Sequence, residues 1–156
     1  MSVIDLKTLY ETDDYEWLES TIELLKNRQF NALDLENLIE ELEDLGSEKR
    51  NAVVSLLEQI IRHLLLLQYW TSERERNQNG WEAEIVSFRI QLKRRLTTNL
   101  RNYLQENLNS IYNDALLFVN KKTGYSVEFP DECPYTLEQL LDLNWYPLDT
   151  LASFSE

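Results

Sequence analysis

The sequence is poor in the residues that most often build turns, disulfides and metal sites. Its 156 residues include three glycines, three prolines, one cysteine and one histidine. Few glycines and prolines disfavour a β-rich fold, which needs many turns, and favour long helices joined by few connections. A single cysteine excludes an internal disulfide framework and a multi-cysteine zinc site. The glycines, at positions 46, 80 and 124, lie too far apart to form a phosphate-binding loop.

Signals for secretion and for membrane insertion are missing as well. The first residues lack the basic stretch and apolar run of a secretory signal, and the longest purely aliphatic run covers only residues 64–67. We therefore expect a cytoplasmic protein that does not enter a membrane. Hydrophobic residues make up 43% of the chain, enough for one core at this length. We expect a single domain over residues 1–156, with residues 1–10 and 148–156 as loose ends.

The net charge of −13 is distributed unevenly. Residues 1–48 carry a net charge of −11, residues 49–123 carry +5, and residues 124–156 carry −7. The simplest interpretation is that the acidic ends pack against the basic middle and offset its charge. The basic side chains of that middle, among them Arg94, Arg95 and Arg101, can contact phosphates, but acidic flanks repel a polyanion, so nucleic acid is disfavoured as a partner.

Apolar spacing predicts an all-α bundle of about five main helices and a short C-terminal helix. The expected helices cover approximately residues 14–27, 35–45, 47–69, 81–96, 100–123 and 136–143. Asp34 is the expected cap of the second helix, and Gly46 is expected to end it in a left-handed conformation, so that the second and third helices form a hairpin. Residues 71–80 are polar, end in Asn-Gly, and predict a surface loop.

Two of these helices carry well-defined apolar stripes. In the second helix the stripe comprises Leu35, Leu38, Ile39, Leu42 and Leu45. The third helix is apolar nearly all round by Leu64, which predicts that it is central and buried. We expect its most buried side chains to be Leu57, Ile60, Ile61, Leu64 and Leu65, and we expect Arg62 to be exposed on the far side.

The most suggestive polar cluster is formed by Glu36, Glu40, Glu43 and His63. In the expected hairpin the glutamates lie beside the third helix, and carboxylates with one imidazole can hold a divalent metal. A di-iron bundle, however, needs Glu-x-x-His on two helices, and this chain has one histidine. The preferred interpretation is structural: the glutamates form ion pairs across helices with basic side chains, the candidates being Arg50, Arg89 and Lys93.

Other candidate chemistry is weaker still. No Gly-x-Ser-x-Gly elbow is present for serine catalysis. Cys133 lies beside Asp131 and Glu132, whose charges disfavour a thiolate, so a packing role is preferred. Near the C-terminus, Trp145 and Tyr146 form an aromatic pair that is a candidate contact patch.

Several stretches together resemble one bacterial family, the domain-of-unknown-function family 29. The stretches cover residues 14–17, 34–46, 48–50, 63–65, 68–69 and 129–141, with Trp81, Ile85 and Arg89 on one helix. The resemblance extends from about Tyr10 to Pro147. One departure is Leu66, where the family often has a lysine. The resemblance implies a helical domain in the bacterial cytoplasm and carries no catalytic role to any position.

These observations favour a non-enzymatic helical domain of unknown function that binds another macromolecule or associates with itself. The expected partner is a protein, and the acidic surface favours a basic one. No cofactor is expected. The alternative is a metal-dependent enzyme that uses the cluster of Glu36, Glu40, Glu43 and His63.

Overall fold

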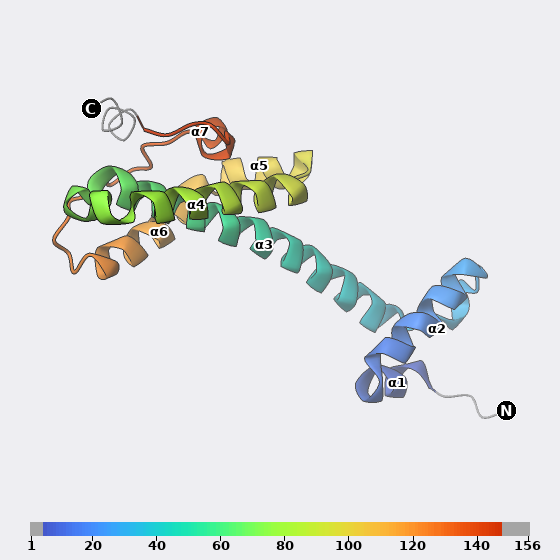
Figure 1. The fold of residues 1–156 in the computed structure, drawn as a ribbon. Helices are drawn as coiled ribbons and strands as arrows, with labels where there is room; N and C mark the ends of the chain where they lie inside the picture. Colours follow the sequence, from blue (N-terminus) through green and yellow to red (C-terminus); the bar gives the residue numbers. More distant parts are fainter. Residues whose placement is uncertain (1–4, 148–156) are drawn as a thin grey trace. The chain divides into compact units, whose positions relative to one another are not determined.

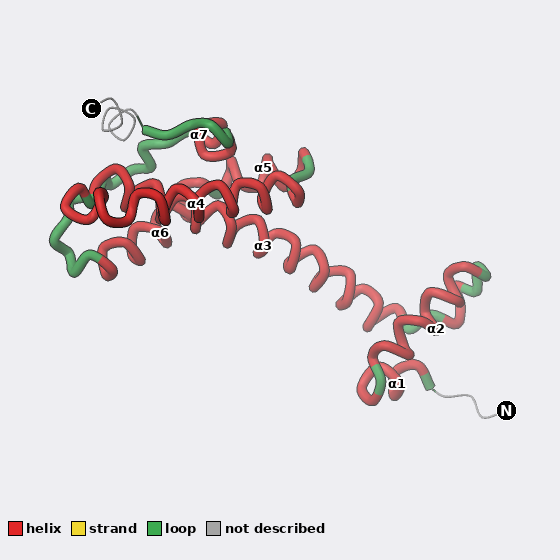
Figure 2. Tube along the Cα trace, viewed as in Figure 1, coloured by secondary structure: helices red, strands yellow, loops and turns green. Residues whose placement is uncertain are grey.

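The computed structural model describes residues 5–147, and every regular element in that range is a helix. The elements are α1 (Leu6–Thr12), α2 (Asp14–Lys26), the 3-10 turn η1 (Phe30–Ala32), α3 (Leu35–Tyr69), α4 (Thr71–Arg95), α5 (Thr98–Glu106), α6 (Leu108–Lys122) and α7 (Leu137–Leu141) (Figure 1). No strand occurs among the described residues (Figure 2). The predicted all-α class is therefore confirmed, whereas the loose end expected at residues 148–156 lies outside the described range.

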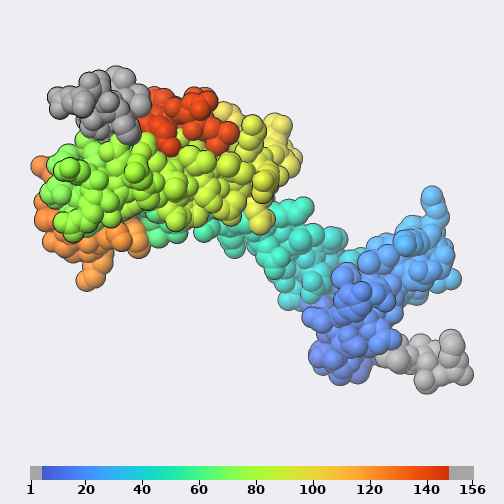
Figure 3. Space-filling view, viewed as in Figure 1, coloured from blue at the N-terminus to red at the C-terminus, as the bar shows by residue number. Residues whose placement is uncertain are grey.

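The chain divides into two compact units, which we describe separately. Unit 1 is Met1–Lys49 and contains α1, α2, η1 and the first part of α3, and unit 2 is Arg50–Glu156. In unit 2 the short helix α7 lies against α4, as the red and green surfaces in Figure 3 show. In unit 1, residues 6–10 belong to α1 rather than to the expected loose arm, because Asp5 caps that helix by accepting a hydrogen bond from the Lys7 amide.

Helix α3 is one continuous helix of 35 residues, so the hairpin expected at Gly46 is wrong. Gly46 does not adopt positive φ, and an added Cβ would meet nothing within 4 Å. A glycine stop is commonly completed by an apolar residue directly after it, which packs back on the helix. Here Ser47 follows instead, and strong helix formers lie on both sides, so the cost of one helical glycine, about 1 kcal/mol, is tolerated.

The hairpin that does form turns at Trp70, where α3 ends and α4 begins. The ring of His63 lies 5.5 Å from that of Phe88, and the ring of Trp70 lies 6.1 Å from that of Trp81, so the two helices run antiparallel. The loop expected at residues 71–80 is wrong, because these residues form the start of α4. Arg74 stabilises the junction by donating hydrogen bonds to the carbonyls of Leu67 and Gln68, the last turn of α3.

The core of unit 2 is built around the second half of α3. The five side chains expected to be most buried are fully buried, and they are Leu57, Ile60, Ile61, Leu64 and Leu65. Arg62 differs from the expectation, since it is only about one-fifth exposed. It forms an ion pair with Glu58 and lies over the ring of Phe118 at 3.8 Å, so α6 covers the side of α3 that we expected to face water.

The later helices follow their capping residues. The predicted boundary near Thr97 is confirmed, because its hydroxyl accepts a hydrogen bond from the Leu100 amide and caps α5. The single helix expected from residue 100 to 123 is broken at Asn107, which separates α5 from α6. Gly124 follows α6 at a φ of +63°, a conformation that glycine adopts without strain. Thr136 and Gln139 form a capping box at α7.

By length and composition alone, α3 is the one helix among residues 5–147 that is long and apolar enough to cross a membrane. Its most apolar window has a mean hydropathy of 1.2, and 44% of that window is buried inside the structure. The core helix of a soluble protein has these same properties. The prediction that the chain does not enter a membrane stays a prediction.

Candidate functional site

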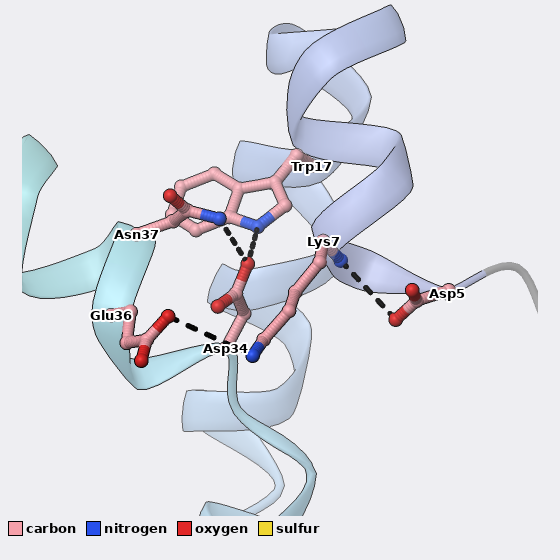
Figure 4. Close-up of polar contacts among 6 residues, drawn as sticks. All are labelled: Asp5, Lys7, Trp17, Asp34, Glu36 and Asn37. Carbon is pink, nitrogen blue, oxygen red and sulfur yellow. Dashed lines mark hydrogen bonds and ion pairs between the residues drawn. The ribbon is translucent and has the colours of Figure 1, made fainter.

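The start of α3 in unit 1 is held by a buried carboxylate. Asp34, only 5% exposed, accepts hydrogen bonds through Oδ2 from the indole N–H of Trp17 at 3.3 Å and from the side-chain amide of Asn37 at 2.6 Å (Figure 4). Trp17 is fully buried on α2. Because one carboxylate joins a residue of α2 to a residue of α3, it fixes where α3 begins relative to α2.

Helix α1 is tied to the same start of α3. The Lys7 ammonium lies 3.7 Å from the Glu36 carboxylate, and the Tyr10 hydroxyl donates a 2.6 Å hydrogen bond to Glu41 (Figure 4 shows the Lys7 contact). The bond to Glu41 and the nearby negative charges raise the pKa of Tyr10 to about 12. The Tyr10 ring also packs edge-on against that of Trp17, at 5.0 Å. Polar contacts rather than a large apolar core therefore join α1, α2 and α3 in this unit.

Apolar stripes on α2 and on the part of α3 in unit 1 remain exposed. The α2 seam comprises Tyr15, Leu18, Ile22 and Leu25, and the α3 seam comprises Leu35, Leu38, Leu42 and Leu45. Seven of these eight side chains are at least 40% exposed, Leu42 reaching 59%, and Leu38 is half-buried. Ile39 and Phe30 are further exposed apolar side chains of unit 1. In unit 1 only Leu9 and Trp17 are buried apolar residues among those described.

A small hollow lies between the two helices, beside the α2 seam. Its volume is about 200 Å³, and its lining combines apolar and acidic side chains, namely Asp14, Tyr15, Trp17, Leu18 and Glu41. The hollow is thus apolar on the α2 side and carries a carboxylate on either helix. That combination suits a side chain with an apolar stem and a cationic head.

The residues of the metal alternative are not brought together. Glu43 and His63 lie 20 residues apart on the same continuous helix, with no turn between them. No group of three or more His, Cys, Asp or Glu side chains within residues 5–147 is placed to hold a metal ion. The convergence that this alternative needed depended on the hairpin at Gly46, and that hairpin is absent from α3.

His63 instead has an environment typical of a histidine at the edge of a core. Its Nδ1 lies 2.7 Å from the Gln59 carbonyl one turn earlier, and its ring faces Phe88. Burial lowers the pKa of His63, against the opposing effects of the Gln59 hydrogen bond and the charge of Glu84. The neutral ring, with Nδ1–H donating to Gln59, is therefore the favoured state.

Two of the three basic residues expected to pair with the glutamates, Arg89 and Arg50, have other contacts. Arg89 is 1% exposed and donates to the carbonyls of Leu140 (2.9 Å), Trp145 (2.8 Å) and Gln139 (3.1 Å). Arg50 lies over the ring of Tyr103 at 5.1 Å, and Lys93 is exposed in the last turn of α4. Arg89 therefore closes unit 2 by binding the end of α7 and the segment after it. Burial lowers the pKa of its guanidinium.

The aromatic pair near the C-terminus is largely used inside the fold. Trp145 packs edge-on against Tyr135 at 5.7 Å, and Tyr146 lies under the Arg89 guanidinium at 5.4 Å. Both rings are half-buried, which leaves less area for a partner than the sequence suggested. Burial raises the pKa of the half-buried Cys133 thiol, in keeping with a packing role.

Sequence reasoning missed the joining role of Trp17 and Asp34. The sequence predicts only a helix cap at Asp34, and Trp17 enters only through the stretch 14–17 that carries the family resemblance. Two signals in the sequence pointed to this role. Both residues lie within stretches that carry the family resemblance, and a buried tryptophan N–H needs a hydrogen-bond acceptor. In sequence, the nearest carboxylates to Trp17 lie on its own helix, so nothing in the spacing singles out Asp34.

Comparison with known proteins gives one match. The family model described as domain of unknown function DUF29 matches residues 9–146. Neither the curated proteins nor the solved structures include a match to the chain.

Proposed function

Because the chain belongs to the DUF29 family, which is described only as a domain of unknown function, we propose a function from its own residues: a non-enzymatic domain that binds another macromolecule through the α2 and α3 seams of unit 1. A bacterial, cytoplasmic setting and the lack of a cofactor stay predictions. The metal-dependent alternative has no supporting geometry within residues 5–147.

The observation that carries the proposal is the exposure of both seams. Monomeric soluble proteins rarely leave a large contiguous apolar surface in water, and such surfaces commonly mark interaction sites. Burial of one large apolar side chain contributes about 1.5–3 kcal/mol. Because Leu42 is 59% exposed, roughly half of this stabilisation can still come from burying it against a partner.

The size of unit 1 supports the same conclusion. It has 49 residues, of which only Leu9 and Trp17 form a buried apolar core among those described. Domains near this size bury a smaller fraction of their surface than larger domains do, and association can stabilise them. A partner on the seams would supply the apolar burial that unit 1 lacks.

In-cell photo-crosslinking tests the proposal. A photoreactive benzoylphenylalanine at Leu42 samples the α3 seam, and the same residue at Glu40 samples the opposite side of that helix, where the side chain is also exposed. We expect a covalent adduct from position 42 with a specific macromolecule, whether a partner or a second copy, and none from position 40. Equal adducts from both positions, or none from position 42, would contradict the proposal.

A further inference from the structure

We propose that the occupant of the seams is a basic amphipathic helix from another protein rather than a second copy of this chain. This inference rests on the proposed function and adds the chemistry of the partner. Both seams have the 3-4-3 spacing of a helix that packs along another helix: 15, 18, 22, 25 in α2, and 35, 38, 42, 45 in α3. Each seam covers about three turns, or roughly 15 Å, so the matching partner helix is short.

The charges beside the seams determine which sign of charge a partner needs. In helix pairing, the residues directly before and after the seam positions meet the flanks of the partner and determine which partner is accepted. Those positions include Asp14, Glu19 and Glu41, against one base, Lys26. Asp34 also flanks the α3 seam, but its carboxylate is buried with Trp17 and Asn37. The accessible flanks are therefore mainly acidic.

A second copy of unit 1 would meet this surface with the same charge. Residues 5–49 hold fourteen acidic and four basic side chains, a net charge of −10. Two such surfaces brought face to face place like charges opposite each other at the flanks, which disfavours the pairing. A partner helix can complement both features of this surface. Leucine or similar residues at its seam positions pack on the apolar seams, and arginine or lysine beside them pairs with the acidic flanks.

The hollow between α2 and α3 gives this partner an anchor. An arginine stem can lie on Tyr15 and Leu18, and its guanidinium then meets the carboxylates of Asp14 and Glu41. The Tyr10 hydroxyl already donates to Glu41, which holds that carboxylate in place before the partner arrives. Because this carboxylate is already held in place, binding loses less side-chain entropy in ordering it.

Three synthetic peptides separate apolar matching from charge. The first has leucine at the seam positions and arginine at the flanks, the second carries glutamate at the same flanks, and the third is a scrambled form of the first with no apolar face. Their binding to the full chain is measured by fluorescence anisotropy. We expect the arginine peptide to bind at least tenfold more tightly than either other peptide, and to weaken as salt is added. Equal binding of the scrambled or the glutamate peptide would overturn the inference.

Variants of the chain identify the surface and the other occupants. Leu42→Ser and Glu41→Gln should each weaken binding of the arginine peptide severalfold or more, whereas Val86→Ser, at an exposed position of α4 in unit 2, should leave it unchanged. Sedimentation showing a dimer that Leu42→Ser abolishes would identify a second copy instead. A Tm for Leu42→Ser that falls, without any partner, by more than the lower helix propensity of serine accounts for would identify an intramolecular contact, which also overturns the inference.

The two proposals fail in different ways. If position 42 crosslinks to a protein but the arginine peptide does not bind, the docking surface stands and the basic helix is wrong. If position 42 gives no adduct and the arginine peptide does not bind, both proposals are wrong.

Discussion

Replacing Gly46 by alanine tests the most consequential feature of the fold, the continuity of α3. Gly46 lies in the interior of this helix, and nothing lies within 4 Å of the position that a new Cβ would occupy. Alanine there narrows the conformations of the unfolded chain and creates no clash. We therefore expect the free energy of unfolding to rise by about 0.5–1 kcal/mol.

If the chain turned at Gly46 with positive φ, the same substitution would lower the free energy of unfolding instead. An alanine at positive φ places its Cβ against the neighbouring carbonyl and costs about 1–2 kcal/mol. The difference between the two outcomes is therefore larger than the error of a denaturation experiment, and the sign alone distinguishes a continuous helix from a hairpin.

Chemical denaturation, followed by far-ultraviolet circular dichroism and by tryptophan fluorescence, measures the change. Circular dichroism reports on the helices of both units, whereas tryptophan fluorescence sums Trp17 of unit 1 and the three tryptophans of unit 2. Agreement between the two probes therefore tests whether the chain unfolds in one step. The chain offers two matched controls. Gly80→Ala, in the open interior of α4, should stabilise as Gly46→Ala does, and Gly124→Ala, at a φ of +63°, should destabilise by about 1 kcal/mol. If Gly46→Ala follows Gly124→Ala, the continuous helix is wrong.

Three further predictions concern unit 2. Arg89→Ala should lower the free energy of unfolding by about 2–4 kcal/mol, because three carbonyls lose a charged donor. Arg89→Lys should recover only part of this loss, since an ammonium lacks the planar fork of a guanidinium, and full recovery by lysine would contradict the described geometry. Thr136→Ala should cost about 1 kcal/mol in the same assay by removing the cap of α7, while Thr136→Ser should be nearly neutral, and equal losses would contradict the capping role. Because burial lowers the pKa of His63 below its ordinary 6.5, the folded chain binds fewer protons than the unfolded chain there, so stability should be complete above that pH and fall as the pH drops toward the folded pKa. A His63→Gln variant should lose this slope below about pH 6.5, and a slope that persists would assign it to other groups.

Much of the helical layout could be predicted because capping residues act locally. Asp13, Thr97 and Thr136 each accept a hydrogen bond from the amide three residues later, so their neighbours in sequence are enough to identify a helix start. Burial along the second half of α3 was predictable for a similar reason: a helix that is apolar nearly all round has to be central.

The connections of α3 could not be predicted by the same rules. A glycine can end a helix or lie in its interior. The residues after Gly46 favour one of these two conformations over the other by only a few tenths to about 1 kcal/mol. Residues 71–80 contain many polar side chains, which form loops and exposed helices equally well. Their helical state depends partly on Arg74 reaching back to the carbonyls of Leu67 and Gln68, a tertiary contact that no local pattern announces.

The candidate site illustrates a further limit of apolar periodicity. The spacing of Leu35, Leu38, Leu42 and Leu45 correctly predicts an apolar face on α3, but it does not say what covers that face. We expected another helix of the same chain, and the described residues of unit 1 leave most of the seam exposed. The partners of Arg89 were predicted wrongly for a different reason. Glutamates were expected, but the buried arginine is satisfied by backbone carbonyls, which every sequence contains and no motif marks.

The partners of Arg89 also determine when unit 2 can be completed during synthesis. The three acceptor carbonyls come from residues 50 to 56 positions later in the chain, at the end of α7 and beyond. A ribosome delivers the chain from its N-terminus, so α3 and α4 emerge while the guanidinium still depends on water for its hydrogen bonds. The native burial of Arg89 is therefore reached only after residue 145 has left the ribosome. In a nascent chain stalled before α7, only water can satisfy the Arg89 guanidinium, and the apolar side chains that α7 packs against stay uncovered.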